Sequence, residues 1–287
     1  MVNIKLELDY LASLLVTYHT LNAPTKENKD NNSDIFKRLQ VSPEERGHYL
    51  TYLLSQGVTL DKTDSIITNL FFPDVKDLEA YLSSYGKDLP NAVKNNLRAF
   101  ESRFNKYFKT LKQYMEHLIK IKKKESKKIM DSIYDTADEI INSQIKRPAE
   151  LEVRVVEGLA PISIETKDKK AYVIMQLRDF LSLTAEDYLI TLIHESVAHK
   201  IVKDFKHYYK GILEGYAYQI EEGFAKLFTE KIGKKILNKS VDYSIQPGTE
   251  NLAYKVFNRN WERLKEKNFA DWYKYCLIDI SNQSSSR

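Results

Sequence analysis

The sequence predicts an α+β protein that is mostly helical and carries a small sheet in its second half. Residues 91–147 contain neither glycine nor proline, and their apolar residues recur with a seven-residue period, as in a long helix. Three short β-rich runs follow at 151–155, 162–164 and 171–177. We therefore expect a mainly helical N-terminal region, residues 1–147, followed by a compact region, residues 148–287, that contains most of the sheet.

The composition is that of a globular chain. Of 287 residues, 43% are hydrophobic and 29% are charged, which provides both a core and a solvated surface and excludes global disorder. Cys276 is the single cysteine, so neither an internal disulfide nor a cysteine-based zinc cluster can form. A reducing, cytoplasmic setting fits this cysteine usage.

The charge pattern argues against two classes of partner. The net charge of +4 is too small to require a nucleic-acid partner. No run approaches the ~18 apolar residues of a membrane span. The first apolar stretch, residues 10–16, follows Glu7 and Asp9, an acidic lead-in unlike that of a secretory leader. We expect neither a membrane nor a nucleic-acid partner.

The N-terminal region begins with alternating apolar residues at 2–8, which favour a strand, and a helix is expected from about Asp9. The polar segment 23–34 is expected to be a loop. Ser42, Pro43 and Glu45 form the start signal of a second helix, with a serine cap and a capping box. That helix is expected to direct three leucines inward: Leu50, Leu53 and Leu54.

The long helix predicted after Pro90 carries two apolar series. We expect this seam to pack within its own domain, and a dimerising coiled coil is the alternative. The Lys-rich stretch 122–128 that follows is expected to form a solvated face, with nucleic-acid contact as a minor alternative. The two series are Leu97, Phe104, Leu111 and Leu118, and Phe100, Tyr107, Tyr114 and Ile121.

After the β-rich runs the pattern becomes helical again. We expect helices over 184–205 and from about 209 to 232, a loop at 246–249, a last helical stretch containing Trp261, Trp272 and Tyr275, and a disordered polar tail over 281–287. Residues 167–170 are expected to turn between the second and third β-rich runs. The run 172–176 is a candidate sheet edge on which an extended peptide could pair.

The segment 192–199 carries the most informative chemistry. His194 and His199 flank Glu195 in an H-E-x-x-x-H pattern, one residue longer than the H-E-x-x-H of zinc peptidases. On a regular helix the two histidines lie roughly 140° apart. A local π-bulge, a feature common at functional sites, would bring the imidazoles closer together. The residues outside that arc are expected to be core: Ile190, Ile193, Val197 and Ile201.

A zinc site needs a third protein ligand and an open position for water. Carboxylates on the next predicted helix can supply that ligand, and we favour Glu222, which allows one helix, a turn and a return after His199. The adjacent Gly223 permits close approach of the two helices. Glu221 and Glu214 are the alternatives, and His207 is a weaker one.

The blocks 194–199 (HESVAH) and 221–225 (EEGFA) together resemble a gluzincin metallopeptidase. In the aminopeptidase branch of that clan, the glutamate of an N-E-G-F-A block is the third zinc ligand, and this chain has Glu221 in place of the asparagine. The longer histidine spacing is similar to that of tubulin-detyrosinating carboxypeptidases and TldD-like peptidases. The resemblance covers about 55 residues, 171–225, and the G-A-M-E-N exopeptidase motif is absent.

The resemblance implies a thermolysin-like unit with two zinc-bearing helices and a zinc-dependent peptidase activity on peptides or protein tails. His194, His199 and Glu222 would hold Zn²⁺, and Glu195 would be the general base. The oxyanion would be assisted by Tyr216, Tyr254 or His207. The competing hypothesis is a non-catalytic binding or scaffold protein with a structural or vestigial metal site.

Overall fold

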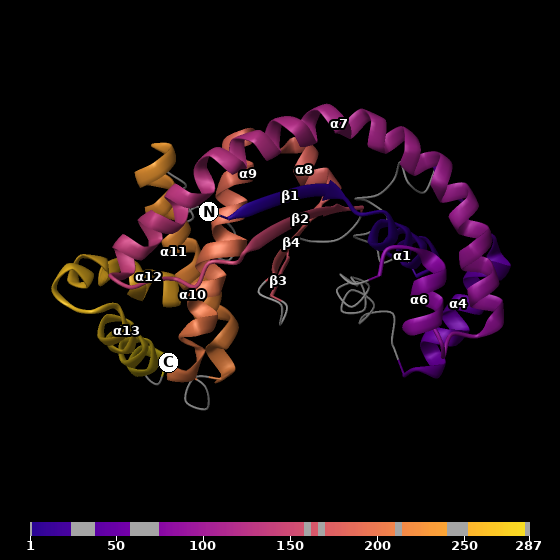
Figure 1. Ribbon diagram of the computed structural model, residues 1–287. Helices are drawn as coiled ribbons and strands as arrows, with labels where there is room; N and C mark the ends of the chain where they lie inside the picture. Colours follow the sequence, from indigo (N-terminus) through magenta and orange to yellow (C-terminus); the bar gives the residue numbers. More distant parts are fainter. Residues whose placement is uncertain are drawn as a thin grey trace.

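The computed structural model describes residues 2–23, 38–57, 75–157, 162–165, 170–209, 214–239 and 252–284. It is mostly helical around one small sheet, which confirms the expected α+β class. A long helix, α7 (Asn91–Ile141), arches over the sheet and connects the two ends of the molecule (Figure 1). The predicted loop at 246–249, and all but the first residue of the one at 23–34, lie outside the described residues.

The sheet has four strands in the order β1-β2-β4-β3. The strands β1 (Asn3–Leu8), β2 (Glu150–Val156) and β4 (Lys170–Gln176) are parallel, and β3 (Ile162–Glu165) pairs antiparallel with β4. The predicted strands are therefore confirmed. The expectation that 172–176 forms a sheet edge is wrong, because β4 is paired on both sides, by β2 and by β3.

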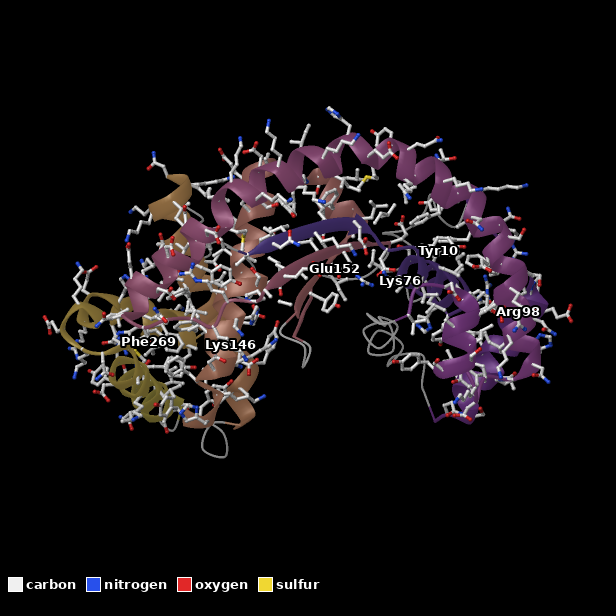
Figure 2. All side chains as sticks on the ribbon, viewed as in Figure 1. Tyr10, Lys76, Arg98, Lys146, Glu152 and Phe269 are labelled. Carbon is white, nitrogen blue, oxygen red and sulfur yellow. The ribbon has the colours of Figure 1, made fainter. Side chains whose placement is uncertain are left out.

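The two faces of the sheet differ in chemistry. One face packs its alternate apolar residues, among them Leu6 and Val153, into a core shared with α7. On the other face Arg154 donates to Asp9 at 2.9 Å and to Glu152 at 2.9 Å, and all three side chains are buried. Figure 2 shows Glu152 on the side of the sheet away from α7. The cost of desolvating these buried charges is offset by their pairing and by the hydrogen bonds between them.

The N-terminal helices α1 (Tyr10–Asn22), α4 (Pro43–Ser55) and α6 (Leu78–Ser84) enclose a second core with the first half of α7. The predicted capping box is confirmed: Glu45 N donates to Ser42 Oγ at 3.1 Å, and Ser42 N donates to Glu45 Oε2 at 2.7 Å. Leu53 is buried, but Leu54 is 67% exposed, so its predicted inward position is wrong. The buried side of α4 instead runs through positions four apart, ending at Leu53.

The helix α7 contributes to both cores. Its first half buries Leu97, Phe100 and Phe104 in the N-terminal core, which confirms packing within the chain itself. Farther along, Tyr114 is 76% exposed, so the second apolar series leaves the core, whereas Leu111 and Leu118 of the first series still pack, partly buried, against the sheet core. The second half of α7 uses other residues against the sheet core: Met115, Met130, Ile133, Tyr134 and Ala137. The predicted division of the chain at residue 147 stays a prediction.

The Lys-rich part of α7 is not a uniformly solvated face. Lys122 is almost fully buried and donates to the carbonyls of Phe180 and, at 2.9 Å, Leu183. Its ammonium lies 4.3 Å from the Phe180 ring centroid, a cation–π contact. Lys122 thereby caps the end of α8 (Leu177–Ser182). Lys124, Lys127 and Lys128 are exposed as expected.

The C-terminal part ends with the helices α12 (Leu252–Arg259) and α13 (Phe269–Ser284). Trp272 is buried and donates to the carbonyl of Asn260 at 2.7 Å. The expected disordered tail is wrong for residues 281–284, which continue α13, while 285–287 lie outside the described residues. No helix in the described parts of the chain is both long and apolar enough to cross a bilayer.

Candidate metal centre

The H-E-x-x-x-H segment lies on a helix with a local change of winding. The helix α9 (Ala185–Leu192) is followed without a break by a π-helix, η3 (Ile193–Ala198), and by α10 (His199–Asp204). The Thr184 hydroxyl caps the start of α9 by accepting a hydrogen bond from the Asp187 amide at 3.1 Å. The predicted helix over 184–205 and the predicted π-bulge are both confirmed.

Two side chains support the π-segment. The Ser196 hydroxyl donates to the carbonyl of Leu192 at 2.6 Å. The buried Tyr134 hydroxyl, from α7, donates to the carbonyl of Ser196 at 3.4 Å. The wider turn of the π-helix disturbs the regular backbone hydrogen bonds of these carbonyl oxygens, and the two hydroxyls bind them instead. The bulge is therefore stabilised by Tyr134 of α7 and by Ser196 of the segment itself.

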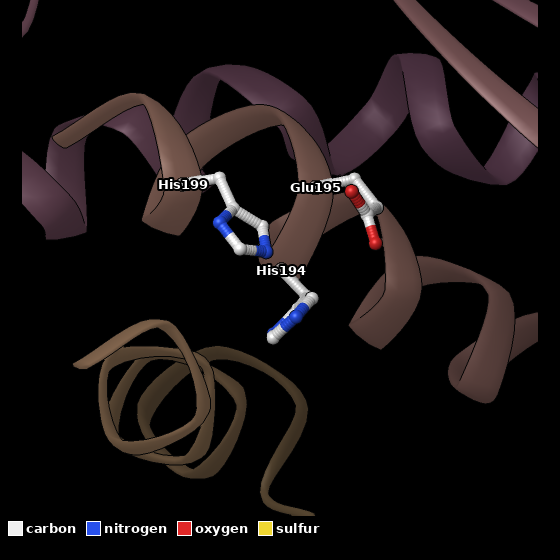
Figure 3. A group of neighbouring side chains, drawn as sticks. All are labelled: His194, Glu195 and His199. Atoms are coloured by element: carbon white, nitrogen blue, oxygen red, sulfur yellow. The ribbon is translucent and has the colours of Figure 1, made fainter. Parts of the chain in front are cut away.

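The bulge brings the two imidazoles together. The ring centroids of His194 and His199 are 4.7 Å apart, with the rings nearly perpendicular. Figure 3 shows the two rings next to each other, with Glu195 beside them. One possible ligand atom from each of His194, Glu195 and His199 lies within 4.8 Å of the others. Among the described residues, this group could hold a metal ion.

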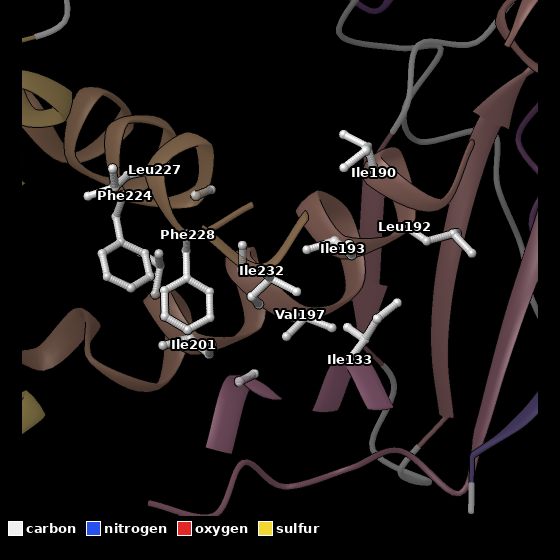
Figure 4. Close-up of a cluster of buried hydrophobic side chains, with 14 of the residues drawn as sticks. Ile133, Ile190, Leu192, Ile193, Val197, Ile201, Phe224, Leu227, Phe228 and Ile232 are labelled. Carbon is white, nitrogen blue, oxygen red and sulfur yellow. The ribbon is translucent and has the colours of Figure 1, made fainter. Parts of the chain in front are cut away.

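The opposite side of the same helix is core, as predicted. Ile190, Ile193, Val197 and Ile201 are all buried. They belong to the cluster that includes Phe228 and Ile232 of α11 (Ala217–Leu237) and Ile133 of α7 (Figure 4). The polar triplet therefore sits on a helix whose rotation is fixed by packing.

The second helix of the site begins later than predicted. The expected start near Tyr209 is wrong, because Tyr209 follows a short 3₁₀ turn, η4 (Lys206–Tyr208). Another 3₁₀ turn, η5 (Glu214–Tyr216), precedes α11. This arrangement places Glu222 five residues after the start of α11, where it faces the two histidines.

Glu222 bridges the two imidazoles. Its Oε2 lies 3.6 Å from His194 Nε2, and its Oε1 lies 3.3 Å from His199 Nε2. These distances exceed the roughly 2.7–2.9 Å of a direct charge-assisted hydrogen bond. They equal the separation of about 3.3–3.6 Å between two ligands that bind one tetrahedral ion at ~2.0–2.2 Å. Each imidazole nitrogen therefore has one carboxylate oxygen at ligand-to-ligand distance, a spacing that is compatible with a shared ion.

The electrostatics of Glu222 suit a ligand. Burial acts to raise the pKa of its carboxyl group, but the favourable interaction with the nearby imidazoles of His194 and His199 outweighs burial and holds that pKa well below its usual range. The carboxylate is therefore ionised at neutral pH. The side chains of all three groups remain partly exposed, between 13% and 20%, so solvent can reach the site.

The alternative ligands lie elsewhere or are not described. Glu221 accepts a hydrogen bond from Tyr209 at 2.5 Å and lies 4.0 Å from Lys206. The side chain of Glu214 is outside the described residues. His207 is exposed, with its ring 3.9 Å from that of Tyr208.

The two tyrosines predicted to assist the oxyanion differ in their burial and hydrogen bonding. Tyr254 is buried and its hydroxyl donates to Glu230 at 2.7 Å, while Tyr216 is half-buried at the start of α11. Sequence reasoning missed Tyr218, which is 75% exposed and lies one helical turn before Glu222. The charge of Glu222, with a smaller contribution from burial, raises the pKa of the Tyr218 phenol. The four-residue spacing from Glu222 was the signal that could have identified it.

Gly223 permits a close approach, but to a different helix than expected. A Cβ atom at this position would lie 2.6 Å from the Tyr254 amide nitrogen and 3.0 Å from the Ala253 Cβ. The glycine therefore packs α11 against α12 rather than against the histidine helix. Its effect on the site is to fix the position of the helix that carries Glu222.

No protein-family model matches the chain, and no curated protein or solved structure gives a significant match.

Proposed function

We propose that this protein is a gluzincin-type zinc peptidase that hydrolyses peptide bonds in peptides or protein tails. The observation that carries the proposal is the position of Glu222, 3.3 and 3.6 Å from the two imidazole nitrogens. Two nitrogens and one carboxylate oxygen, with solvent access, are the ligand set of a catalytic zinc site. A structural zinc site would instead be closed by four protein ligands.

The positions of the four polar side chains suggest a role for each in the proposed zinc site. His194, His199 and Glu222 would hold the ion. A zinc ion supplies a Lewis acid and lowers the pKa of water toward ~7. Glu195, with a carboxylate oxygen within 4.8 Å of a nitrogen of each histidine, would accept the proton of the attacking water and return it to the leaving amine.

Tyr218 is our candidate for the oxyanion donor. Its side chain is exposed one turn before Glu222 on the same side of α11, and an un-ionised phenol can donate a hydrogen bond at neutral pH. Tyr254 is a weaker candidate because its hydroxyl proton is already donated to Glu230.

The substrate backbone would extend along β3. Within the described ranges no strand pairs with the outer side of β3, and β3 lies against the π-helix that carries His194 and Glu195. An extended peptide that adds to this edge would be held by main-chain hydrogen bonds, which make few demands on its side chains.

One observation argues against the competing function, a scaffold with a structural metal. Phe104, which would lie in a dimer interface, is fully buried in the chain's own core. The metal sites of the two hypotheses remain distinguishable by chemistry, because only a peptidase requires Glu195.

Metal analysis and hydrolysis of a peptide library test the proposal. We expect one zinc per chain, lost in His194→Ala, His199→Ala and Glu222→Ala but kept in His207→Ala, the matched exposed control. Glu195→Gln is expected to keep the metal and abolish hydrolysis. A wild-type protein with no metal contradicts the site, and one with zinc but no hydrolysis of any peptide supports the scaffold.

A further inference from the structure

Thr229 contacts the first histidine of the site from behind. It lies on α11 seven residues after Glu222, on the same side of the helix, and is fully buried. Its Oγ1 lies 3.3 Å from His194 Nδ1, the ring nitrogen that does not face Glu222. The same Oγ1 donates to the carbonyl of Ala225 at 2.7 Å.

The single hydroxyl proton of Thr229 determines which partner donates in its contact with His194. A threonine hydroxyl has one proton and two acceptor lone pairs. The short bond to Ala225, whose carbonyl can only accept, uses that proton. Toward His194, Thr229 can therefore act only as an acceptor, and Nδ1 must carry the hydrogen.

We propose that Thr229 is a positioning residue that holds His194 in the Nδ1–H tautomer, with the lone pair of Nε2 directed toward Glu222. An imidazole binds a metal only through an unprotonated nitrogen, and the partner of the other nitrogen selects the tautomer and the ring orientation. This inference rests on the proposed metal site.

The arrangement gives α11 two tasks at one site. Through Glu222 it supplies a ligand, and through Thr229 it orients a ligand that belongs to the other helix. The partner here is a neutral hydroxyl rather than the carboxylate that often supports a zinc-bound histidine. A neutral partner fixes the ring without adding negative charge behind it.

Zinc affinity in three variants tests the role. Thr229→Val removes the hydroxyl at nearly constant shape and is expected to weaken zinc binding about 10–100-fold, as loss of such a supporting group does in other metal sites. Thr229→Ser keeps the hydroxyl and is expected to bind zinc almost as the wild type does. Thr191→Val is the matched control, because Thr191 makes the same bond to a carbonyl four residues back but contacts no histidine in that bond.

A second measurement does not depend on the variant folding or on metal. In the metal-free wild-type protein labelled with ¹⁵N-histidine, long-range ¹H–¹⁵N spectra are expected to show His194 protonated at Nδ1. The Nε2–H tautomer overturns the inference, as does unchanged zinc affinity in a folded Thr229→Val variant. Failure of the wild type to bind zinc while Nδ1 is protonated overturns the proposed function alone.

Discussion

The amide of His199 donates its hydrogen bond to the carbonyl oxygen of His194, five residues earlier. In a regular helix the partner would be four residues away. The wider turn stacks residue 199 above residue 194, as residues four apart stack in an α-helix. The H-E-x-x-x-H spacing is therefore equivalent in space to H-E-x-x-H, with one extra residue absorbed by the winding.

Changing the length of the π-segment tests this equivalence. Deleting Ser196 should convert the segment to a regular helix with the histidines still one turn apart, so zinc binding is expected to persist. Inserting an alanine after Ser196 should rotate His199 away and abolish zinc binding. The interpretation fails if the deletion variant keeps its helical circular dichroism but contains no zinc.

Two glycines in helices should respond to alanine in opposite directions. Gly223→Ala would place a Cβ 2.6 Å from a backbone nitrogen, and overpacking of this kind costs about 1–3 kcal/mol. Gly47→Ala, inside α4, meets nothing within 4 Å and is expected to stabilise by about 0.5–1 kcal/mol. Urea unfolding of both variants measures the difference, and equal effects would refute the close approach of α11 and α12.

The buried Glu157 should make stability depend on pH. Burial raises the pKa of its carboxyl group to about 7, although a hydrogen bond from Tyr107 at 3.0 Å acts in the opposite direction. Between about pH 4.5 and 7 the folded state then binds more protons than the unfolded state, so the free energy of unfolding falls as the pH rises through this window.

Glu157→Gln should remove that dependence. At pH 8 the variant is expected to be more stable than the wild type by up to about 3 kcal/mol, since each pKa unit corresponds to about 1.4 kcal/mol. Exposed Glu116→Gln on α7 is the control and should leave the pH profile unchanged. Urea unfolding at pH 5 and pH 8 gives the comparison, and parallel profiles for wild type and Glu157→Gln would contradict the protonated, buried carboxyl.

Three tyrosine variants discriminate the oxyanion candidates of the proposed peptidase. Tyr218→Phe is expected to lower kcat by roughly 100–1000-fold with unchanged zinc content, which is the usual loss when one donor to a developing oxyanion is removed. Tyr254→Phe and Tyr216→Phe should leave kcat nearly unchanged, although Tyr254→Phe loses its bond to Glu230. A large drop in kcat for Tyr254→Phe instead would restore the sequence-based candidate.

The sequence predicted those features of the fold that depend on residues within a single helix or strand. The capping box at Ser42 and the alternation of β1 are short-range patterns, and both appear in the structure. The π-bulge was predictable because H-E-x-x-x-H cannot converge on a regular helix. Glu222 was selected by its distance along the chain from His199, and the structure brings the three residues together.

The errors concern positions that depend on distant partners. Leu54 and Leu53 are adjacent leucines, and only packing against α7 determines which one is buried. Lys122 belongs to a run of lysines, and its burial depends on carbonyl groups about sixty residues away. The interior position of β4 depends on its two neighbours in the sheet, β2 and β3, and not on its own residues.

The helix α7 extends for 51 residues, about 75 Å, and forms one wall of each core. We therefore expect that neither half of the protein folds stably when it is excised without α7. A fragment that begins at residue 148 would lack the strand that pairs with β2, the tyrosine that supports the bulge and the wall that covers the sheet. A destabilising substitution in the N-terminal half of α7 is therefore expected to lower the cooperativity with which the histidine-bearing core unfolds.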